Sequence, residues 1–191
     1  MLGPPTIREA AYGVHGVFRL LRFDRSGLAF FDASAAGAMR SFWLAPVLFP
    51  AFLLISMLQM WGILGEVGFA EFLLVEAVAY VIGWTLYPLA AWYVAERLDR
   101  AGRYTGYLTA YNWFVVPQAV LWLPLVAAVG GGLVPEAMGD WLLTLFGFLV
   151  LVYHWFIARE ALELPGPVSF GLVVLDVLLA AFVQNWAIAL L

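Results

Sequence analysis

Five long apolar stretches, separated by short polar connections, constrain the fold of this chain more than any other feature of its sequence. They cover about residues 42–61, 68–95, 107–129, 141–158 and 168–191. A helix needs roughly 20 apolar residues to cross the hydrocarbon core of a bilayer. Each stretch has about that length, so the sequence predicts an all-α, polytopic membrane protein: an N-terminal arm over 1–41 and a domain of five transmembrane helices over 42–191.

The composition agrees with this prediction. Of the 191 residues, 65% are hydrophobic and only 12% are charged, whereas a soluble domain is about half apolar and a quarter charged. Lipid must therefore be the solvent for most of the apolar surface. The chain has no cysteine, which excludes disulfides, thiolate metal sites and cysteine nucleophiles.

The arm over residues 1–41 carries the signal of a helix start. Thr6 and Glu9 have the spacing of a capping box, in which each side chain binds the backbone amide of the other residue. A helix is expected to follow, to about Phe23. Asp32 or Ser34 is expected to cap a second helix that continues into the membrane.

The expected arm helix is amphipathic. Its apolar residues recur at helical spacing on one face, and Arg8, Arg19 and Arg22 lie on another. This pattern is typical of a helix in the membrane interface whose arginines contact lipid headgroups. The alternative is a helix that packs on a partner or on the protein's own bundle.

The basic residues give the expected orientation. All nine are arginine, which indicates a coding bias of bacterial type, and they occur only in the arm and in alternate connections. They are Arg8, Arg19, Arg22, Arg25 and Arg40 in the arm, Arg97, Arg100 and Arg103 after the second stretch, and Arg159 after the fourth. The positive-inside rule then predicts a bacterial inner-membrane protein with a cytoplasmic N-terminus and an external C-terminus.

Several polar side chains lie inside the apolar stretches and are candidates for a site. They are Glu76, Asn112, Gln118, His154, Asp176, Gln184 and Asn185. Ionisable groups in a membrane are costly and usually face the interior of a helix bundle. Two interpretations remain open: a path for protons or a substrate, or hydrogen bonds that only hold the helices together.

The helical rise of 1.5 Å per residue places these groups at two depths. The predicted layers are, toward the cytoplasm, Asp176 with His154 and Asn112, and, toward the outside, Glu76 with Gln184 or Asn185. The fourth and fifth stretches are joined by a tight Pro-Gly-Pro turn. This hairpin is expected to bring Asp176 and His154 into contact.

Most enzyme chemistry has no support in the sequence. Only His154 lies in an apolar stretch, because His15 is in the arm, so two-histidine haem and zinc sites in the membrane are excluded. No catalytic or phosphate-binding motif occurs, and no cofactor is expected. The arginine clusters indicate topology and lipid contact, not nucleic acid.

The expected function is therefore that of a non-enzymatic scaffold or accessory subunit. It would bind membrane lipids, other membrane proteins or a second copy of itself. The alternative is a small transporter or channel that uses Glu76, His154 and Asp176.

A family resemblance rests on segment order and on the start of the third stretch. Gly106 and Tyr107 open this stretch, ahead of Tyr111 and Pro117. With five spans and a cytoplasmic arm, residues 40–191 resemble the Yip (Ypt-interacting-protein) family in its bacterial form. The Asp-Leu-Tyr-Gly-Pro motif of eukaryotic members is absent, so the resemblance implies a five-helix fold more than an activity.

Overall fold

The computed structural model describes residues 3–60 and 67–191, and in these ranges every regular element is helical. The elements are α1 (Ile7–Leu20), a 3-10 helix η1 (Arg25–Phe30), α2 (Ala35–Ser41), α3 (Leu44–Gln59), α4 (Phe69–Arg97), α5 (Ala101–Gly130), α6 (Glu136–Leu162) and α7 (Gly166–Leu190).

Five helical segments among the described residues are long and apolar enough to cross a membrane. The first, Ala35–Gln59, consists of α2, α3 and the residues between them. The other four lie in α4, α5, α6 and α7. The prediction of an all-α chain with five apolar helices is confirmed at this level, which is compatible with a multi-pass membrane protein. The first segment begins earlier than residue 42, and its expected end at Trp61 lies outside the described residues.

The helix ends follow the local sequence. The Thr6 hydroxyl accepts a hydrogen bond of 3.2 Å from the Glu9 amide, and the Glu9 carboxylate accepts one of 2.8 Å from the Thr6 amide. The predicted capping box of α1 is therefore confirmed. Ser34, not Asp32, caps α2, with its hydroxyl 3.0 Å from the Gly37 amide.

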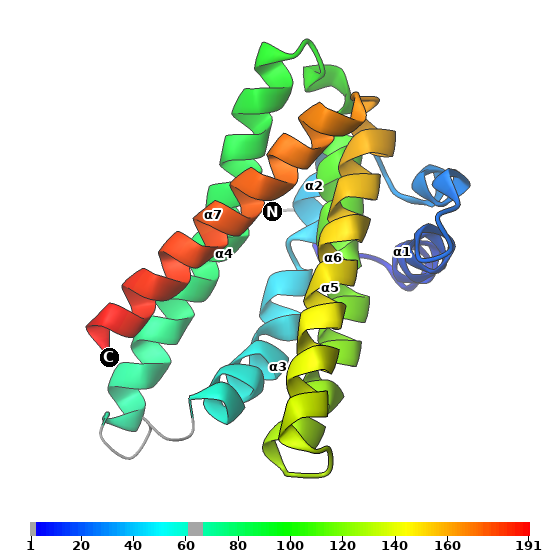
Figure 1. The fold of residues 1–191 in the computed structure, drawn as a ribbon. Helices are drawn as coiled ribbons and strands as arrows, with labels where there is room; N and C mark the ends of the chain where they lie inside the picture. The colour runs from blue at the N-terminus through cyan, green and yellow to red at the C-terminus, as the bar shows by residue number, and fades with distance from the viewer. Residues whose placement is uncertain (1–2, 61–66) are drawn as a thin grey trace.

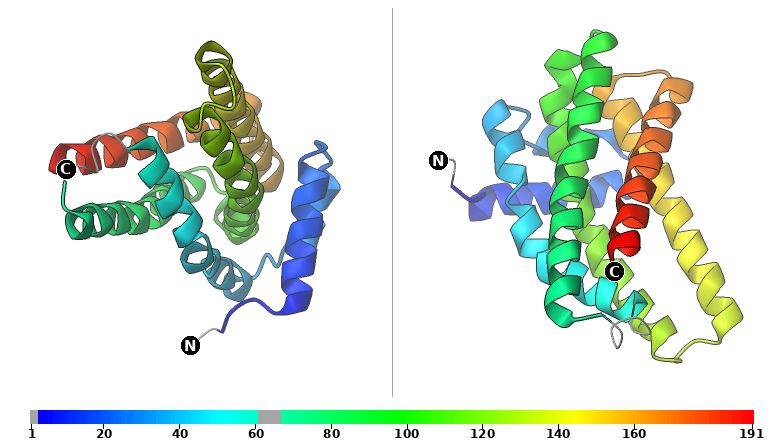
Figure 2. Two further views of the ribbon diagram at one scale, coloured as in Figure 1. Left: turned by 90° about the horizontal axis from the view of Figure 1, so that it is seen from below. Right: turned by 90° about the vertical axis from the view of Figure 1, so that its left-hand side faces the viewer.

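The helices form two groups. α4 packs along α7, while α3 and α6 both pack on α5 (Figure 1). The α6–α7 hairpin joins the two groups. α1 and η1 lie on the outer side of α5 and α6, and α1 runs crosswise to the bundle helices, as the two views of Figure 2 show.

The main core lies where the arm, α4, α5 and α6 meet. Its fully buried side chains include Leu20, Tyr107, Phe114, Ile157 and Leu162. A second, smaller cluster joins α4 to α7 further along the bundle. Tight packing is thus concentrated at one end of the bundle and is sparser between the two groups of helices.

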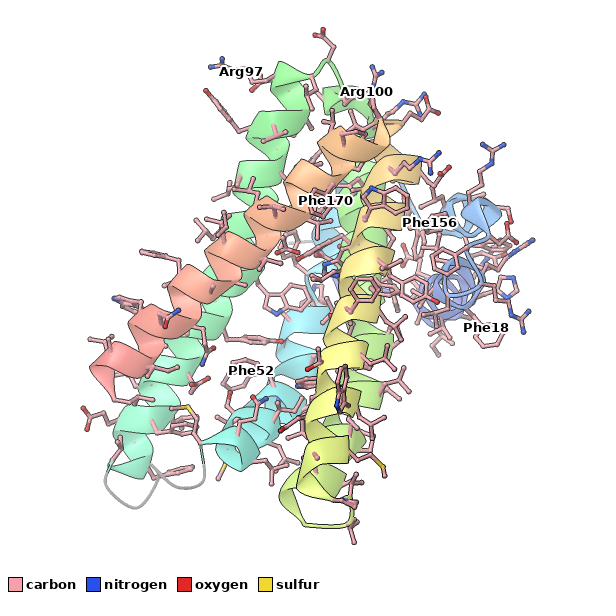
Figure 3. All side chains as sticks on the ribbon, viewed as in Figure 1. Phe18, Phe52, Arg97, Arg100, Phe156 and Phe170 are labelled. Atoms are coloured by element: carbon pink, nitrogen blue, oxygen red, sulfur yellow. The ribbon has the colours of Figure 1, made fainter. Side chains whose placement is uncertain are left out.

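The arginine-bearing connections lie together at one end of the bundle. The α4–α5 and α6–α7 connections are bridged by an ion pair of 2.7 Å between Arg103 and Glu163. Arg97 and Arg100 extend from the same end (Figure 3). Glu163 ends α6 with a left-handed backbone conformation, φ 50°, which lets the chain turn at once into α7.

The arm helix packs on the protein's own bundle. Gly13 lies against Trp113 of α5, so closely that a Cβ atom there would be 2.5 Å from the indole ring. The Tyr153 hydroxyl of α6 donates a 2.6 Å hydrogen bond to the Leu21 carbonyl. The opposite side of α1 stays free and carries Ile7, which is 91% exposed. Of the two alternatives for this helix, packing on the bundle is observed, and an apolar stripe still faces outward.

Candidate functional site

The candidate site is centred on Asp176 of α7, which three helices bring into contact with other polar groups. His154 of α6 places Nδ1 3.1 Å from Asp176 Oδ2. The Tyr111 hydroxyl of α5 donates to both carboxylate oxygens, at 3.1 and 3.0 Å. Gln118, two turns along α5, lies with Nε2 2.8 Å from His154 Nε2. The predicted contact between Asp176 and His154 is therefore confirmed.

The Asp176–His154 contact is electrostatic in character. Its distance is within ion-pair range, but His154 Nδ1 has no hydrogen-bond partner of suitable geometry among the described residues. The two side chains are only 14% and 11% exposed.

Two proton arrangements fit the distances around His154. In the neutral ring, Nε2 accepts from the Gln118 amide and Nδ1–H faces Asp176. In the protonated ring, Gln118 turns its amide oxygen toward Nε2–H instead. In both arrangements Tyr111 donates to Asp176.

Aromatic residues enclose this group. The Tyr111 ring lies 4.9 Å from the His154 ring, centroid to centroid, and 4.9 Å from the Tyr87 ring. The buried hydroxyls of Tyr87 and Tyr107 are hydrogen-bonded to each other. These rings separate the site from the arginine-bearing end of the bundle.

Asn112 is not part of the Asp176 group, contrary to the prediction. Its amide nitrogen donates a 2.8 Å hydrogen bond to the Ser41 hydroxyl of α2. Ser41 in turn donates to the Ala38 carbonyl at 2.7 Å. Since the Ser41 hydroxyl has one proton, it must accept from Asn112, and Asn112 Oδ1 is left buried without a partner among the described residues. The helical rise places Asn112 near the level of Asp176, but the Asn112 amide bonds Ser41 of α2 instead of Asp176.

The predicted outer layer is wrong in its partners. Glu76 is buried and receives a 2.8 Å hydrogen bond from the Ser56 hydroxyl of α3. Gln184 is exposed, and the Asn185 amide donates to the Ala181 carbonyl of its own helix at 2.8 Å. Glu76 therefore bonds to α3 and to neither amide of α7.

Two adjoining cavities lie beside the site, between the two groups of helices. The larger, of about 380 Å³, has walls from α3, α4, α5 and α7 that include Tyr111, Asn112, Gln118 and Gln184. The second, of about 310 Å³, is lined mostly by apolar side chains of α3, α5 and α6, with Tyr80 of α4. The residues common to both walls are Phe52, Tyr80, Val115 and Gln118. Figure 3 shows Phe52 in the middle of the molecule, between the two groups.

Ion pairs hold the parts of the arm together. Arg40 of α2 contacts Glu9 at 2.5 Å and Asp32 at 2.7 Å. Hydrogen bonds from Ser34, with the charge of Arg40, lower the pKa of Asp32. The backbone hydrogen bond from Thr6 similarly lowers the pKa of Glu9. These ionised carboxylates hold α1, α2 and the intervening loop together.

The three predicted lipid-contacting arginines differ in their surroundings. Arg19 is paired with Asp24 at 2.6 Å. Ser26 and then Arg19 lower the pKa of Asp24 to about 2. Arg8 and Arg22 instead contact aromatic rings of α1: Arg8 donates to the Tyr12 hydroxyl, and the Arg22 guanidinium lies 4.4 Å from the Phe18 ring centre.

Comparison with known proteins found no match among family models, curated proteins or solved structures. Within residues 3–60 and 67–191, no three histidine, aspartate or glutamate side chains are grouped to hold a metal ion. The candidate site is therefore described by its own geometry.

Sequence reasoning overlooked the hydroxyl partners of the polar groups. The sequence pattern places Tyr111 on the same polar helical face as Gln118, but that pattern does not show which group on another helix Tyr111 contacts. Ser41 and Ser56 gave no comparable signal, because a lone serine in an apolar helix is common and its hydroxyl often binds its own backbone.

Proposed function

We propose that this chain is a non-enzymatic, multi-pass membrane protein that binds anionic lipid through its arm and serves as a scaffold or accessory subunit. The observation that carries the proposal is the outward stripe of α1, where Ile7, Val14 and Phe18 are exposed. An exposed apolar stripe beside a membrane-spanning helix would be costly in water but is stabilised by lipid.

The stripe is continuous with the surface of α5. Val14 and Phe18 share a groove of about 190 Å³ with Val116 and Val120 of α5. An acyl chain lying along α5 would fill this groove. The Arg22 guanidinium, stacked on Phe18, would then lie at the level of a lipid headgroup, where each basic residue contributes about 1 kcal/mol.

The proposed orientation places the arginine-bearing end in the cytoplasm of a bacterial cell, by the positive-inside rule. The N-terminus would then be cytoplasmic and the C-terminus external. A Yip-like bundle has this order of segments, so the resemblance is retained as part of the proposal.

Lipid binding by the arm is tested with the double variant Arg8→Glu/Arg22→Glu in liposomes. Chymotrypsin cleaves at aromatic residues of α1, which the variant leaves unchanged. In phosphatidylglycerol liposomes, the variant is expected to be cleaved in the arm faster than the native chain, and in phosphatidylcholine liposomes at the same rate. Arg97→Glu/Arg100→Glu, an equal charge change outside the arm, is the matched control. Equal cleavage of variant and native arms in both lipids would contradict the proposal.

A small transporter is the second candidate, and one observation favours it. Tyr111 and Gln118 line the larger cavity and also bond directly to Asp176 and His154. A solute in this cavity would be one hydrogen bond away from the Asp176–His154 pair. Glu76 is not part of this arrangement, because its partner is Ser56.

The two candidates differ in proton flux. A transporter of this type would dissipate a pH gradient in proteoliposomes, and Asp176→Asn would abolish the flux while Glu76→Gln would not. A scaffold would give no flux above that of empty liposomes. A pH-sensitive dye inside the liposomes measures the difference.

A further inference from the structure

We infer that the α4–α7 pair can swing as one unit about the arginine-bearing end of the bundle, and that the hydrogen bond between Ser56 and Glu76 holds its far end closed against α3. This motion involves no residue of the arm, so it goes beyond the proposed function. The inference rests on where the helices are fixed to each other, where space lies between them, and on one unpartnered oxygen atom of Glu76.

The α4–α7 pair has the packing of a single unit. α4 packs closely along α7 and more sparsely on α3 and α5. A buried cluster of Ala79, Val183 and Ala187 joins the two helices away from the arginine-bearing end. Because this cluster consists of residues of α4 and α7 only, the two helices can stay together while they move relative to the others.

The pivot lies at the arginine-bearing end, where the pair is fixed to α5 and α6. Ala91 and Ala95 of α4 are fully buried there, and the Tyr104 hydroxyl of α5 donates a 2.6 Å hydrogen bond to the Pro88 carbonyl. α6 and α7 are joined by the short turn 163–165 and then diverge (Figures 1 and 2). Pro88 also has no amide hydrogen for the helix ladder, so α4 can bend at the border of the fixed region.

Beyond the fixed region, space replaces packing. On α7, Asp176 makes the polar contacts to α5 and α6. The cavity of about 380 Å³ begins one turn further along, with Ala180, Val183 and Gln184 in its wall, and it separates the pair from α3 and α5. The lining of a void lacks partner atoms on one side and gains little attraction across it. The far parts of α4 and α7 are therefore held less firmly than the parts near the pivot.

Ser56 and Glu76 join α3 to α4 across this division, near the far end. The Ser56 hydroxyl donates a 2.8 Å hydrogen bond to Glu76 Oε2, and Glu76 is 1% exposed. Glu76 Oε1 has no hydrogen-bond partner among the described residues. Tyr80, one turn closer to the pivot, adds a 2.8 Å hydrogen bond to the Ala45 carbonyl. A swing about the pivot would thus separate Glu76 from α3 more than it separates Tyr80.

The unpartnered oxygen opposes the closed position. A buried acceptor without a partner is costly, and this cost disappears when water reaches the carboxyl group. Glu76 lies seven residues from the start of α4, about 10 Å along the helix, so a small swing admits water from that end. The Ser56 hydrogen bond favours closure by an amount of similar size. The pair can therefore occupy both a closed and an open position.

The test measures distances between spin labels on the full chain in phosphatidylcholine nanodiscs, because the chain has no native cysteine. The reporting pair is Ala127→Cys on α5 and Ala189→Cys on α7, at the far end. The control pair, Gly102→Cys and Val168→Cys, is on the same two helices near the pivot. All four native residues are exposed. We expect two distances in the reporting pair and a single, narrow distance in the control pair.

Ser56→Ala leaves the Glu76 carboxyl group buried with neither oxygen bonded. It should raise the ratio of the long to the short reporting distance at least about fivefold. Ser56→Ala/Glu76→Leu makes both partners apolar and should return the reporting pair to the short distance, since replacing both partners of a hydrogen bond can be nearly neutral.

A single reporting distance that is the same in the native chain and in Ser56→Ala would overturn the inference. So would a double variant that stays open. Equal changes in the reporting and control pairs would also overturn it, because they would show a general loosening of the bundle and not a swing. None of these variants changes a residue of the arm, so the lipid-binding test of the arm is decided separately.

Discussion

At the scale of single residues, the Asp176 carboxylate links three helices through its contacts with Tyr111 and His154. Tyr111, His154 and Asp176 come from α5, α6 and α7, and each contacts at least one of the others within 3.1 Å. The group therefore fixes the rotation of three helices about their own axes as well as their separation.

Replacing Asp176 with Asn should destabilise the protein by about 1–2 kcal/mol, because it removes a charge-assisted hydrogen bond and the attraction to His154. His154→Gln in that background should cost little more, since the pair is already broken. The free energy of unfolding is measured in mixed detergent and denaturant for both single variants and the double variant. The three values together give the coupling free energy between the two side chains. Additive losses would mean that the two side chains do not act as a pair.

Acidic residues of the arm give it a predicted pH dependence. The pKa values of Glu9, Asp24 and Asp32 are lowered by hydrogen bonds and by arginine. A lowered pKa means that the packed arm favours the ionised carboxylate, so this contribution is present above the ordinary pKa and is lost as pH falls through the lowered one. For Asp24 the window runs from 3.8 to about 2.

The arm should therefore loosen between about pH 4 and pH 2. The chain has no cysteine, so spin labels can be placed on Ala11→Cys and Gly102→Cys without background. The distance between them should be narrowly distributed at pH 7 and broad near pH 2. A distribution that stays narrow down to pH 2 would show that the carboxylates do not hold the arm.

The residues also show what a sequence can predict about a polar site. The Asp176–His154 contact could be predicted because the two lie on consecutive helices joined by a tight turn, where depth alone nearly determines proximity. Asn112 and Glu76 were assigned wrongly because depth says nothing about which neighbour a helix face meets. Their partners, Ser41 and Ser56, come from the first of the five long apolar segments, whose rotation the sequence does not reveal.

At the scale of elements, two glycines allow α1 to pack closely on its neighbours. Gly13 and Gly16 let its backbone approach Trp113 of α5 and the η1 segment. The amphipathic pattern predicted the helix and its outward stripe. It did not predict the inward face, because glycine contributes no hydrophobic signal even where it allows the closest packing.

Gly13→Ala should release or displace α1 from the bundle. The new methyl group would meet three atoms of the Trp113 ring at 2.5–2.7 Å, and such overpacking typically costs about 1–3 kcal/mol. That exceeds the gain of up to about 1 kcal/mol from replacing glycine in a helix. Chymotrypsin digestion of the arm should become faster. The control is Gly102→Ala in the first turn of α5, where a Cβ atom has no neighbour within 4 Å; equal digestion of the two variants would contradict the packing.

At the scale of the whole molecule, the order of the helices and the side on which each connection lies could be predicted from the apolar stretches. The division into an α4–α7 pair and a group around α5 could not, and neither could the cavities between them. These arise from helix rotation and from small side chains such as Gly83 and Gly147, which line the cavities. A sequence gives the length of each helix far more directly than the shape of the space between helices.

The central claim is that the chain crosses the membrane five times with its arginine-bearing end in the cytoplasm. Labelling of single cysteines in intact bacterial cells by a membrane-impermeant maleimide tests it directly, because the native chain has no cysteine. Leu133→Cys and Leu191→Cys should react in intact cells, and Gly102→Cys only after the membrane is permeabilised. Labelling of Gly102→Cys in intact cells, or protection of Leu191→Cys, would contradict the account.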